Sequence, residues 1–304
     1  PSPVFDVVSC VSATAAQASS SARSTLTPVS ISGWNGHACL IPSHDISGRE
    51  LMKNCWKESD DGESELVLLL FGLLLIAALY ASVGHGGASG YLALLSLSTL
   101  ASMDPVWLKQ HAWSLNLVVA TIAFWHYHRE GFHLPRLTIP FIAASIPFAL
   151  LGGYLGVGGS VYDLLLSLTL LWAAWRLWGG SSADSAADVA LPDAKAAVPV
   201  GGAIGLVSGV IGIGGGIFLT PVLLLKRWAT PKQAAATGAL FIWVNSLAGL
   251  VGSFASNQMQ LEAQLLIPFI AAVLLGGLIG SRYGSVMAPE SKVRRLWGWD
   301  SSSS

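Results

Sequence analysis

Two clusters of glycine residues lie inside strongly apolar parts of this chain. The first reads VGHGGASG and the second reads GVIGIGGG, and together they contain Gly84, Gly86, Gly87, Gly212, Gly214, Gly215 and Gly216. Glycine breaks helices, and a helix that restarts after a break has backbone N–H groups without partners in its first turn. Such donors, aided by the helix dipole, bind anions. The clusters therefore predict that backbone amides bind a small anion.

Four polar side chains complete the predicted substrate site. His85 lies within the first cluster, and the apolar segments after the clusters contain Asn116, Thr237 and Asn245. A buried polar group without a partner is costly, and an ionisable residue inside a membrane is a functional candidate. We expect all four to contribute to the site. The alternatives are hydrogen bonds between helices for the two asparagines and a neutral, hydrogen-bonded state for His85.

Other glycines are predicted to pack helices together. Three of them, Gly201, Gly205 and Gly209, recur at every fourth residue, and the pairs Gly152/Gly156 and Gly276/Gly280 have the same spacing. This spacing is typical of close helix–helix contacts in membranes. The two clusters differ because each places three or four glycines within five residues, which packing alone does not require.

The chain contains an internal repeat. The sequence IPFIAA occurs at Ile139–Ala144 and at Ile267–Ala272, an offset of 128 residues (267 − 139), and Gly84 and Gly212 share that offset (212 − 84). Two unrelated motifs with one offset indicate a duplicated unit. Duplicated membrane units with interrupted helices are typical of secondary transporters, in which the interruptions form the binding site.

Composition places both copies in a membrane. Hydrophobic residues make up 53% and charged residues 11% of the 304 residues, whereas a soluble domain has about 25% charged residues. The stretches 66–103, 137–162, 196–225, 233–261 and 263–281 contain no Asp, Glu, Lys or Arg. Because a span needs about 20 apolar residues, we predict an all-α integral membrane protein with about seven or eight spans. The net charge of −1 excludes the basic surface that nucleic acid requires.

The chain divides into five predicted segments. They are a disordered or loosely ordered extension (1–64), a first membrane repeat (65–178), a polar linker (179–195), a second membrane repeat (196–295) that lacks a counterpart of the last span, and a tail (296–304).

The glycine-broken segments are predicted to be one span followed by a half-helix. As one helix, residues 66–103 would be about 57 Å long, against a bilayer core of about 30 Å. The equivalent stretch 196–225 has too few residues for two full passes. We expect the helix to break at the glycines in each copy, with both breaks turning their amides toward a shared cavity that solvent can reach.

The chain has no motif that predicts an enzyme. The patterns HExxH and GxSxG are absent, and the glycine clusters lack the Lys-Ser/Thr pair of a nucleotide-binding loop. We predict no catalytic residues, cofactor or metal site. The alternative of a metal bound by His126, His128 and His133 is less favoured than histidines near lipid headgroups.

Five stretches resemble one known family. GHGGASGYLALLSL (84–97), LNLVVA (115–120) and IPFIAASIPFALLGG (139–153) resemble the first repeat of the TauE/SafE, or sulfite exporter, family of permeases. GLVSGVIGIGGGIFLTPVLLL (205–225) and AAATGALFIWVNSLAGL (234–250) resemble its second repeat. The resemblance covers residues 66–284, and the glycine and asparagine positions named above match the family's motifs. It implies a polytopic transporter of small anions, with sulfite and organosulfonates as the usual substrates.

The predicted function is secondary transport by a multi-pass protein of the plasma membrane. The substrate is a small, sulfur-containing anion such as sulfite or an organosulfonate, moved by alternating access and coupled to a proton or another ion. The expected partners are therefore the lipid bilayer, the anion and the coupling ion. The alternative is a membrane-embedded accessory or assembly protein whose glycines serve only packing.

Overall fold

The computed structural model describes residues 48–155, 157, 159–178 and 189–287, and every regular element in these ranges is a helix. This confirms the predicted all-α class. Contacts divide the chain into two units, residues 1–68 and 69–304. Helix α2 (Gly48–Ala81) begins in the first unit, so the last part of the expected loose extension is helical. Residues 1–47 and the expected tail lie outside the described residues.

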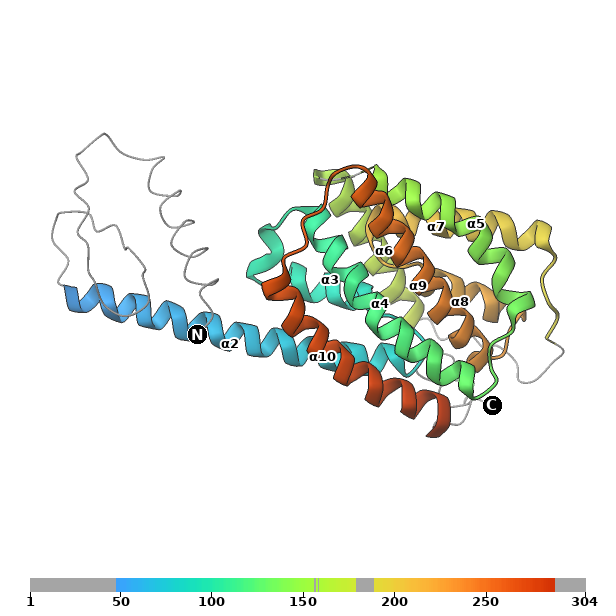
Figure 1. The fold of residues 1–304 in the computed structure, drawn as a ribbon, viewed down its shortest axis with the longest axis horizontal. Coiled ribbons are helices and arrows are strands. Elements are labelled where there is room, and N and C mark those ends of the chain that lie inside the picture. The colour runs from blue at the N-terminus through green and yellow to red at the C-terminus, as the bar shows by residue number, and fades with distance from the viewer. Residues whose placement is uncertain (1–47, 156, 158, 179–188, 288–304) are drawn as a thin grey trace. The chain divides into compact units, whose positions relative to one another are not determined.

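The second unit is built from helices that follow α2 in the chain (Figure 1). They are α3 (Ala88–Ser96), the 3₁₀ helix η1 (Thr99–Ser102), α4 (Pro105–Arg129), α5 (Pro135–Tyr154), α6 (Gly159–Trp178), α7 (Ala194–Ile211), α8 (Gly216–Leu225), α9 (Pro231–Ala255), α10 (Ala263–Arg282) and the π-helical turn η2 (Tyr283–Met287).

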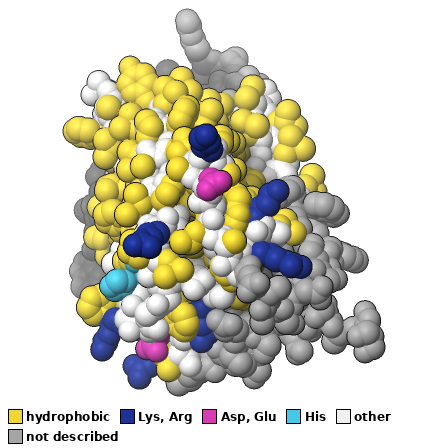
Figure 2. All heavy atoms as spheres, turned by 90° about the vertical axis from the view of Figure 1, so that its right-hand side faces the viewer, with side chains coloured by type: hydrophobic (Ala, Val, Ile, Leu, Met, Phe, Trp, Pro, Cys, Tyr) yellow, Lys and Arg dark blue, Asp and Glu magenta, His cyan; other side chains and the backbone are white. Residues whose placement is uncertain are grey.

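Five helices in the described part are long and apolar enough to cross a membrane. They are Ser64–Ala81, Pro135–Tyr154, Ala194–Ile211, Pro231–Ala255 and Ala263–Val286. The two shorter apolar helices are Ser160–Leu171 and Gly216–Leu225. Hydrophobic side chains cover most of the face shown in Figure 2, where charged residues lie in isolated places. The most exposed apolar residues include Leu171, Phe254, Ile267 and Ile279. Such a surface suits lipid rather than water.

Each glycine cluster separates a long helix from a short one, as the sequence predicted. The first break lies between α2 and α3, and the second lies between α7 and α8. Each short helix has only 9 or 10 residues, which gives a length of about 15 Å or less, half of a bilayer core. Gly87 and Gly215 precede the short helices with φ of 95° and 82°. Only glycine adopts this left-handed conformation at no steric cost.

Helices α4 and α9 form a matched pair at the centre of the second unit. Both have 25 residues and start with a proline, Pro105 or Pro231, an offset of 126 residues (231 − 105). Asp104 caps α4 by accepting from the Val106 N–H at 2.7 Å, and Thr230 forms a capping box with Gln233 at the start of α9. The two helices pack against each other.

The spaced glycines pack helices, as predicted. A methyl group on Gly201, Gly205 or Gly209 of α7 would meet the α5 backbone at Phe141, Ser145 and Ala149, respectively. On α10, methyl groups at Gly276 and Gly280 would overlap the α2 carbonyls of Leu74 and Ala78. Glycine lets these backbones approach each other closely. Gly152 also packs on α7, at Gly209, whereas Gly156 lies outside the described residues.

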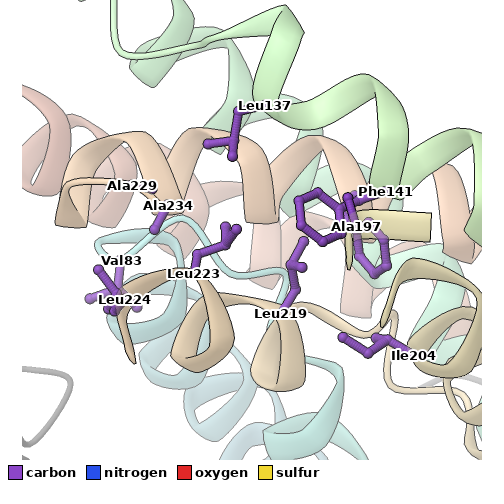
Figure 3. Packing of buried hydrophobic residues seen from close by; sticks show 11 residues of the cluster. Val83, Leu137, Phe141, Ala197, Ile204, Leu219, Leu223, Leu224, Ala229 and Ala234 are labelled. Carbon is purple, nitrogen blue, oxygen red and sulfur yellow. The ribbon is translucent and has the colours of Figure 1, made fainter. Parts of the chain in front are cut away.

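A hydrophobic cluster holds the half-helix α8 in place (Figure 3). Leu219 and Leu223 of α8 are fully buried, and they lie in one cluster with Phe141 of α5, Ile204 of α7 and Val83. Val83 immediately precedes Gly84. Burying a leucine side chain contributes roughly 1.5–3 kcal/mol, so this cluster fixes the second half-helix beside the first break.

Candidate functional site

The two helix breaks meet at the side chain of Asn116 on α4. Its Oδ1 accepts a hydrogen bond from the backbone N–H of Ala88, the first residue of α3, at 3.0 Å. Its Nδ2 lies 3.3 Å from the carbonyl oxygen of Ile213, in the second break, and 3.3 Å from the hydroxyl of Ser246 on α9. One amide therefore connects the start of a half-helix in the first copy with the break in the second copy.

Two cluster glycines allow this close approach. A methyl group on Gly86 would overlap Asn116 Oδ1 and lie 2.9 Å from Ile242 Cγ2. A methyl group on Gly214 would lie 2.7 Å from Asn116 Nδ2 and 2.9 Å from the same atom of Ile242. Gly86 and Gly214 thus both pack against Asn116 and Ile242, and any side chain at either position would separate the breaks.

The two breaks make equivalent contacts with α4 and α9. Asn116 and Ile242 are each 11 residues after the first proline of their helix (116 − 105 and 242 − 231). Gly84 packs on the Ala235 backbone of α9, and Gly212 packs on Lys109 of α4, each 4 residues after the same prolines (235 − 231 and 109 − 105). The arrangement is an approximate two-fold with one polar side and one apolar side.

This arrangement differs from the pairing in the sequence. The sequence pairs Asn116 with Asn245, whereas the contacts pair Asn116 with Ile242. Asn245 Nδ2 donates to the Phe241 carbonyl of its own helix at 2.8 Å, and its Oδ1 is buried without a hydrogen-bond partner among the described residues. The printed contacts of Asn245 do not reach the breaks, so its part in substrate binding stays a prediction.

His85 of the first break reaches the second break. Its side chain is 3% exposed, and its Nδ1 lies 3.4 Å from the Val83 carbonyl oxygen. A methyl group on Gly216, the first residue of α8, would lie 3.5 Å from His85 Nε2. The predicted residues of the two clusters are therefore neighbours in space.

Thr237 lies one residue from this contact region. Its hydroxyl oxygen is 3.1 Å from that of Thr138 on α5. A methyl group on the next residue, Gly238, would lie 3.0 Å from Thr220 Oγ1 and 3.9 Å from His85 Cε1. Thr237 thus belongs to the wall of the first break, although its own hydroxyl contacts α5.

Backbone donors at the breaks have no acceptors. The N–H groups of Gly86, Gly87, Gly214 and Gly215 donate to no acceptor in the part of the chain that the structure describes. All four residues are buried. Buried N–H groups without partners are rare in proteins, and here two pairs of them flank one amide side chain. Each pair also lies at the N-terminal, positive end of a half-helix.

The charges near the breaks favour an anion. Among the described residues, the buried charged side chains are Lys109 and Lys232, and neither Asp nor Glu is buried. A cation site needs carboxylate or carbonyl oxygens, whereas this region supplies N–H donors and a buried lysine. The described residues also contain no group of three or more potential metal ligands.

Three buried hydroxyl groups near the breaks were not identified from the sequence. Tyr91, Ser208 and Thr220 have no hydrogen-bond partner within the described residues. Methyl groups on Gly87 and Gly215 would lie 2.7 Å from Tyr91 Oη and 3.4 Å from Ser208 Cβ. Each hydroxyl residue is four positions, or one helical turn, from a cluster glycine: Gly87, Gly212 and Gly216. That spacing was a usable signal.

The breaks are closed off from solvent in this structure. Residues 81–89 and 211–216 are all buried, so the expected solvent-reachable cavity between the breaks does not occur in this conformation. A cavity of about 300 Å³ lies instead along α5, lined mainly by apolar residues that include Ile139, Ile142 and Ile146. The breaks are together, as expected, but in an enclosed state.

Comparisons with known proteins agree with this architecture. The family described as sulfite exporter TauE/SafE matches residues 68–299. A probable membrane transporter protein, y4hK of Sinorhizobium fredii, is 37% identical over 226 residues, which cover 73% of this chain and 90% of that protein. A second, YunE of Bacillus subtilis, is 24% identical over 258 residues, which cover 76% and 92%. No solved structure matches the chain. With its helix breaks and this match, the chain belongs to the sulfite exporter TauE/SafE family.

Proposed function

We propose that this protein is a secondary transporter that moves a small anion across the plasma membrane by alternating access. The observation that carries the proposal is the pair of helix breaks on either side of Asn116, with buried N–H groups that have no acceptor among the described residues. Family membership supports it, as do the two relatives named as probable membrane transporter proteins.

The substrate is proposed to be a compact oxyanion such as sulfite or the head group of an organosulfonate. Several oxygen atoms on one centre can accept hydrogen bonds from several amides at once. Gly86 and Gly214 both contact Asn116, so the space between the breaks suits a small group. The name of the family, sulfite exporter, supports sulfur as the central atom.

Alternating access in this proposal is a movement of the breaks apart on one side at a time. The enclosed state described above is one stage of that cycle. When the breaks separate, the amides of Gly86, Gly87, Gly214 and Gly215 become accessible, and the bound anion satisfies them. Asn116 keeps contact with one break while it releases the other. His85, Thr237 and Asn245 are the further side chains proposed to contact the substrate.

A flux assay tests the proposed function. The purified protein is placed in proteoliposomes, and the flux of sulfite, methanesulfonate, sulfate and chloride is compared with that in protein-free vesicles. We expect a saturable sulfite or sulfonate flux that increases with an opposing gradient of the same anion, because a carrier returns faster when loaded. Saturation and counter-transport also distinguish a carrier from a channel. A folded protein that moves none of these anions favours an accessory or assembly role.

A further inference from the structure

Lys109 is a buried lysine without a hydrogen-bond partner in the described part of the chain. Its side chain is 0% exposed, and its Nζ atom has no acceptor. The other buried lysine, Lys232, is satisfied, because its Nζ donates to the Ser285 carbonyl at 3.1 Å and lies 4.8 Å from the centre of the Phe132 ring. The difference between the two lysines requires an explanation.

Lys109 lies beside the second helix break. A methyl group on Gly212 would lie 2.5 Å from Lys109 Cβ and 3.0 Å from its Cα. Asn116, which contacts Gly214 in the same break, follows Lys109 by seven residues. Seven residues are two helical turns, so both side chains project from one face of α4, about 10 Å apart along the helix. That face packs against the second break.

The nearest acidic residue does not satisfy Lys109. Asp104 precedes α4, and its Oδ1 accepts from the Val106 N–H at 2.7 Å as the helix cap. The described residues give Lys109 no ion pair. A charge that is buried and unpaired costs several kcal/mol, so a lysine here is unfavourable until an anion arrives.

We propose that Lys109 pairs with the transported anion at the Gly212 end of the second break; this rests on the transport function proposed above. The ammonium group attracts the oxyanion, and the amides beside Asn116 hold its remaining oxygen atoms. Arginine and lysine are the usual charge partners of oxyanions. The residue pairs Lys109/Ala235 and Asn116/Ile242 make α4 the polar wall of the site and α9 the apolar wall.

The test uses three single variants of the full chain: Lys109→Met, Lys109→Arg and Lys226→Met. Lys226 is exposed, so Lys226→Met makes the same change in charge away from the breaks. Two quantities are measured for each: sulfite flux in proteoliposomes, and the melting temperature in detergent with and without sulfite. We expect Lys109→Met to weaken the sulfite dependence of both by about tenfold to a hundredfold, as for the loss of a charged hydrogen bond. Lys109→Arg keeps the charge and most of the affinity, and Lys226→Met resembles wild type.

A second readout separates anion pairing from a structural role. Without sulfite, Lys109→Met should melt at the wild-type temperature or above it, because it removes an unsatisfied buried charge. A lower melting temperature, a failure to purify as a folded protein, or an unchanged sulfite affinity would each overturn the proposal for Lys109. Wild-type flux that survives Lys109→Met removes only this inference, whereas a wild-type protein that moves none of the anions removes the transport function as well.

Discussion

The side-chain amide of Asn116 lies 3.3 Å from the carbonyl oxygen of Ile213, although 97 residues separate them in the chain. The same side chain accepts from the Ala88 N–H in the first copy. Both contacts are buried. One residue on α4 thus holds the two helix breaks together in the enclosed state, and its removal tests the site directly.

Replacing Asn116 by leucine should abolish anion flux and lower the stability of the protein. Leucine has a similar size but leaves the Ala88 N–H and the Ile213 carbonyl without partners, at a cost of roughly 1–3 kcal/mol for each buried group. Asn245→Leu is the matched control, because the Asn245 amide donates within its own helix. Flux and melting temperature are measured for both. Equal losses of flux in the two variants would contradict the central place of Asn116.

Replacing Gly86 by alanine should prevent the breaks from closing on Asn116. The added methyl group would overlap Asn116 Oδ1, so we expect lost flux and a lower melting temperature. Gly131→Ala is the control: Gly131 also has a positive φ of 79°, and a methyl group there meets nothing within 4 Å. The control should keep its flux and lose only about 1 kcal/mol of stability to backbone strain. A Gly86→Ala protein with wild-type flux would show that the close approach is unnecessary.

Gln110 on α4 is predicted to fasten the turn that follows α9. Its Nε2 donates to Ser253 Oγ at 2.7 Å and to the Gln258 carbonyl at 2.6 Å, and its Oε1 accepts from the Gln260 N–H at 2.7 Å. Gln110→Ala should therefore speed hydrogen exchange in residues 256–262. Ser114→Ala is the control, because the Ser114 hydroxyl bonds only to its own helix, at the Gln110 carbonyl. Unchanged exchange in Gln110→Ala would show that the turn is held by other contacts.

Thr237 and Thr138 are predicted to act as a pair. Their hydroxyl oxygens are 3.1 Å apart in a buried contact between α9 and α5. If the bond only joins the helices, Thr237→Val and Thr138→Val should lower the melting temperature equally, and the double variant should add little, since each single change already breaks the bond. A larger loss of sulfite affinity in Thr237→Val alone would place Thr237 in contact with the substrate.

Local rules account for much of the fold that the sequence predicted. Charge-free apolar stretches long enough to cross a bilayer require helices, because no other local structure satisfies the backbone in lipid. Glycine clusters interrupt those helices at predictable places, and the short helices α3 and α8 follow from the breaks at Gly87 and Gly215. The spacing of Gly201, Gly205 and Gly209 likewise predicted a close helix contact, which α5 makes.

The partners of the site residues depended on long-range packing. An offset of 129 residues (245 − 116) suggested that the two asparagines are equivalent, but the contacts pair Asn116 with Ile242. The register in which α4 and α9 face the breaks is set by which side chains fit against Gly86 and Gly214, and a sequence offset does not encode that fit. The burial of Lys109 without a partner is likewise a property of the packed helices.

The sequence alone thus determined a helical membrane protein with two glycine breaks and the residue types near them, because hydropathy and helix breaking are local properties. Only the tertiary structure decided that Asn116 joins both breaks, that Ile242 lies opposite it, and that Lys109 is buried beside Gly212. These contacts join residues about 100 or more positions apart in the chain, and each depends on the close packing of whole helices.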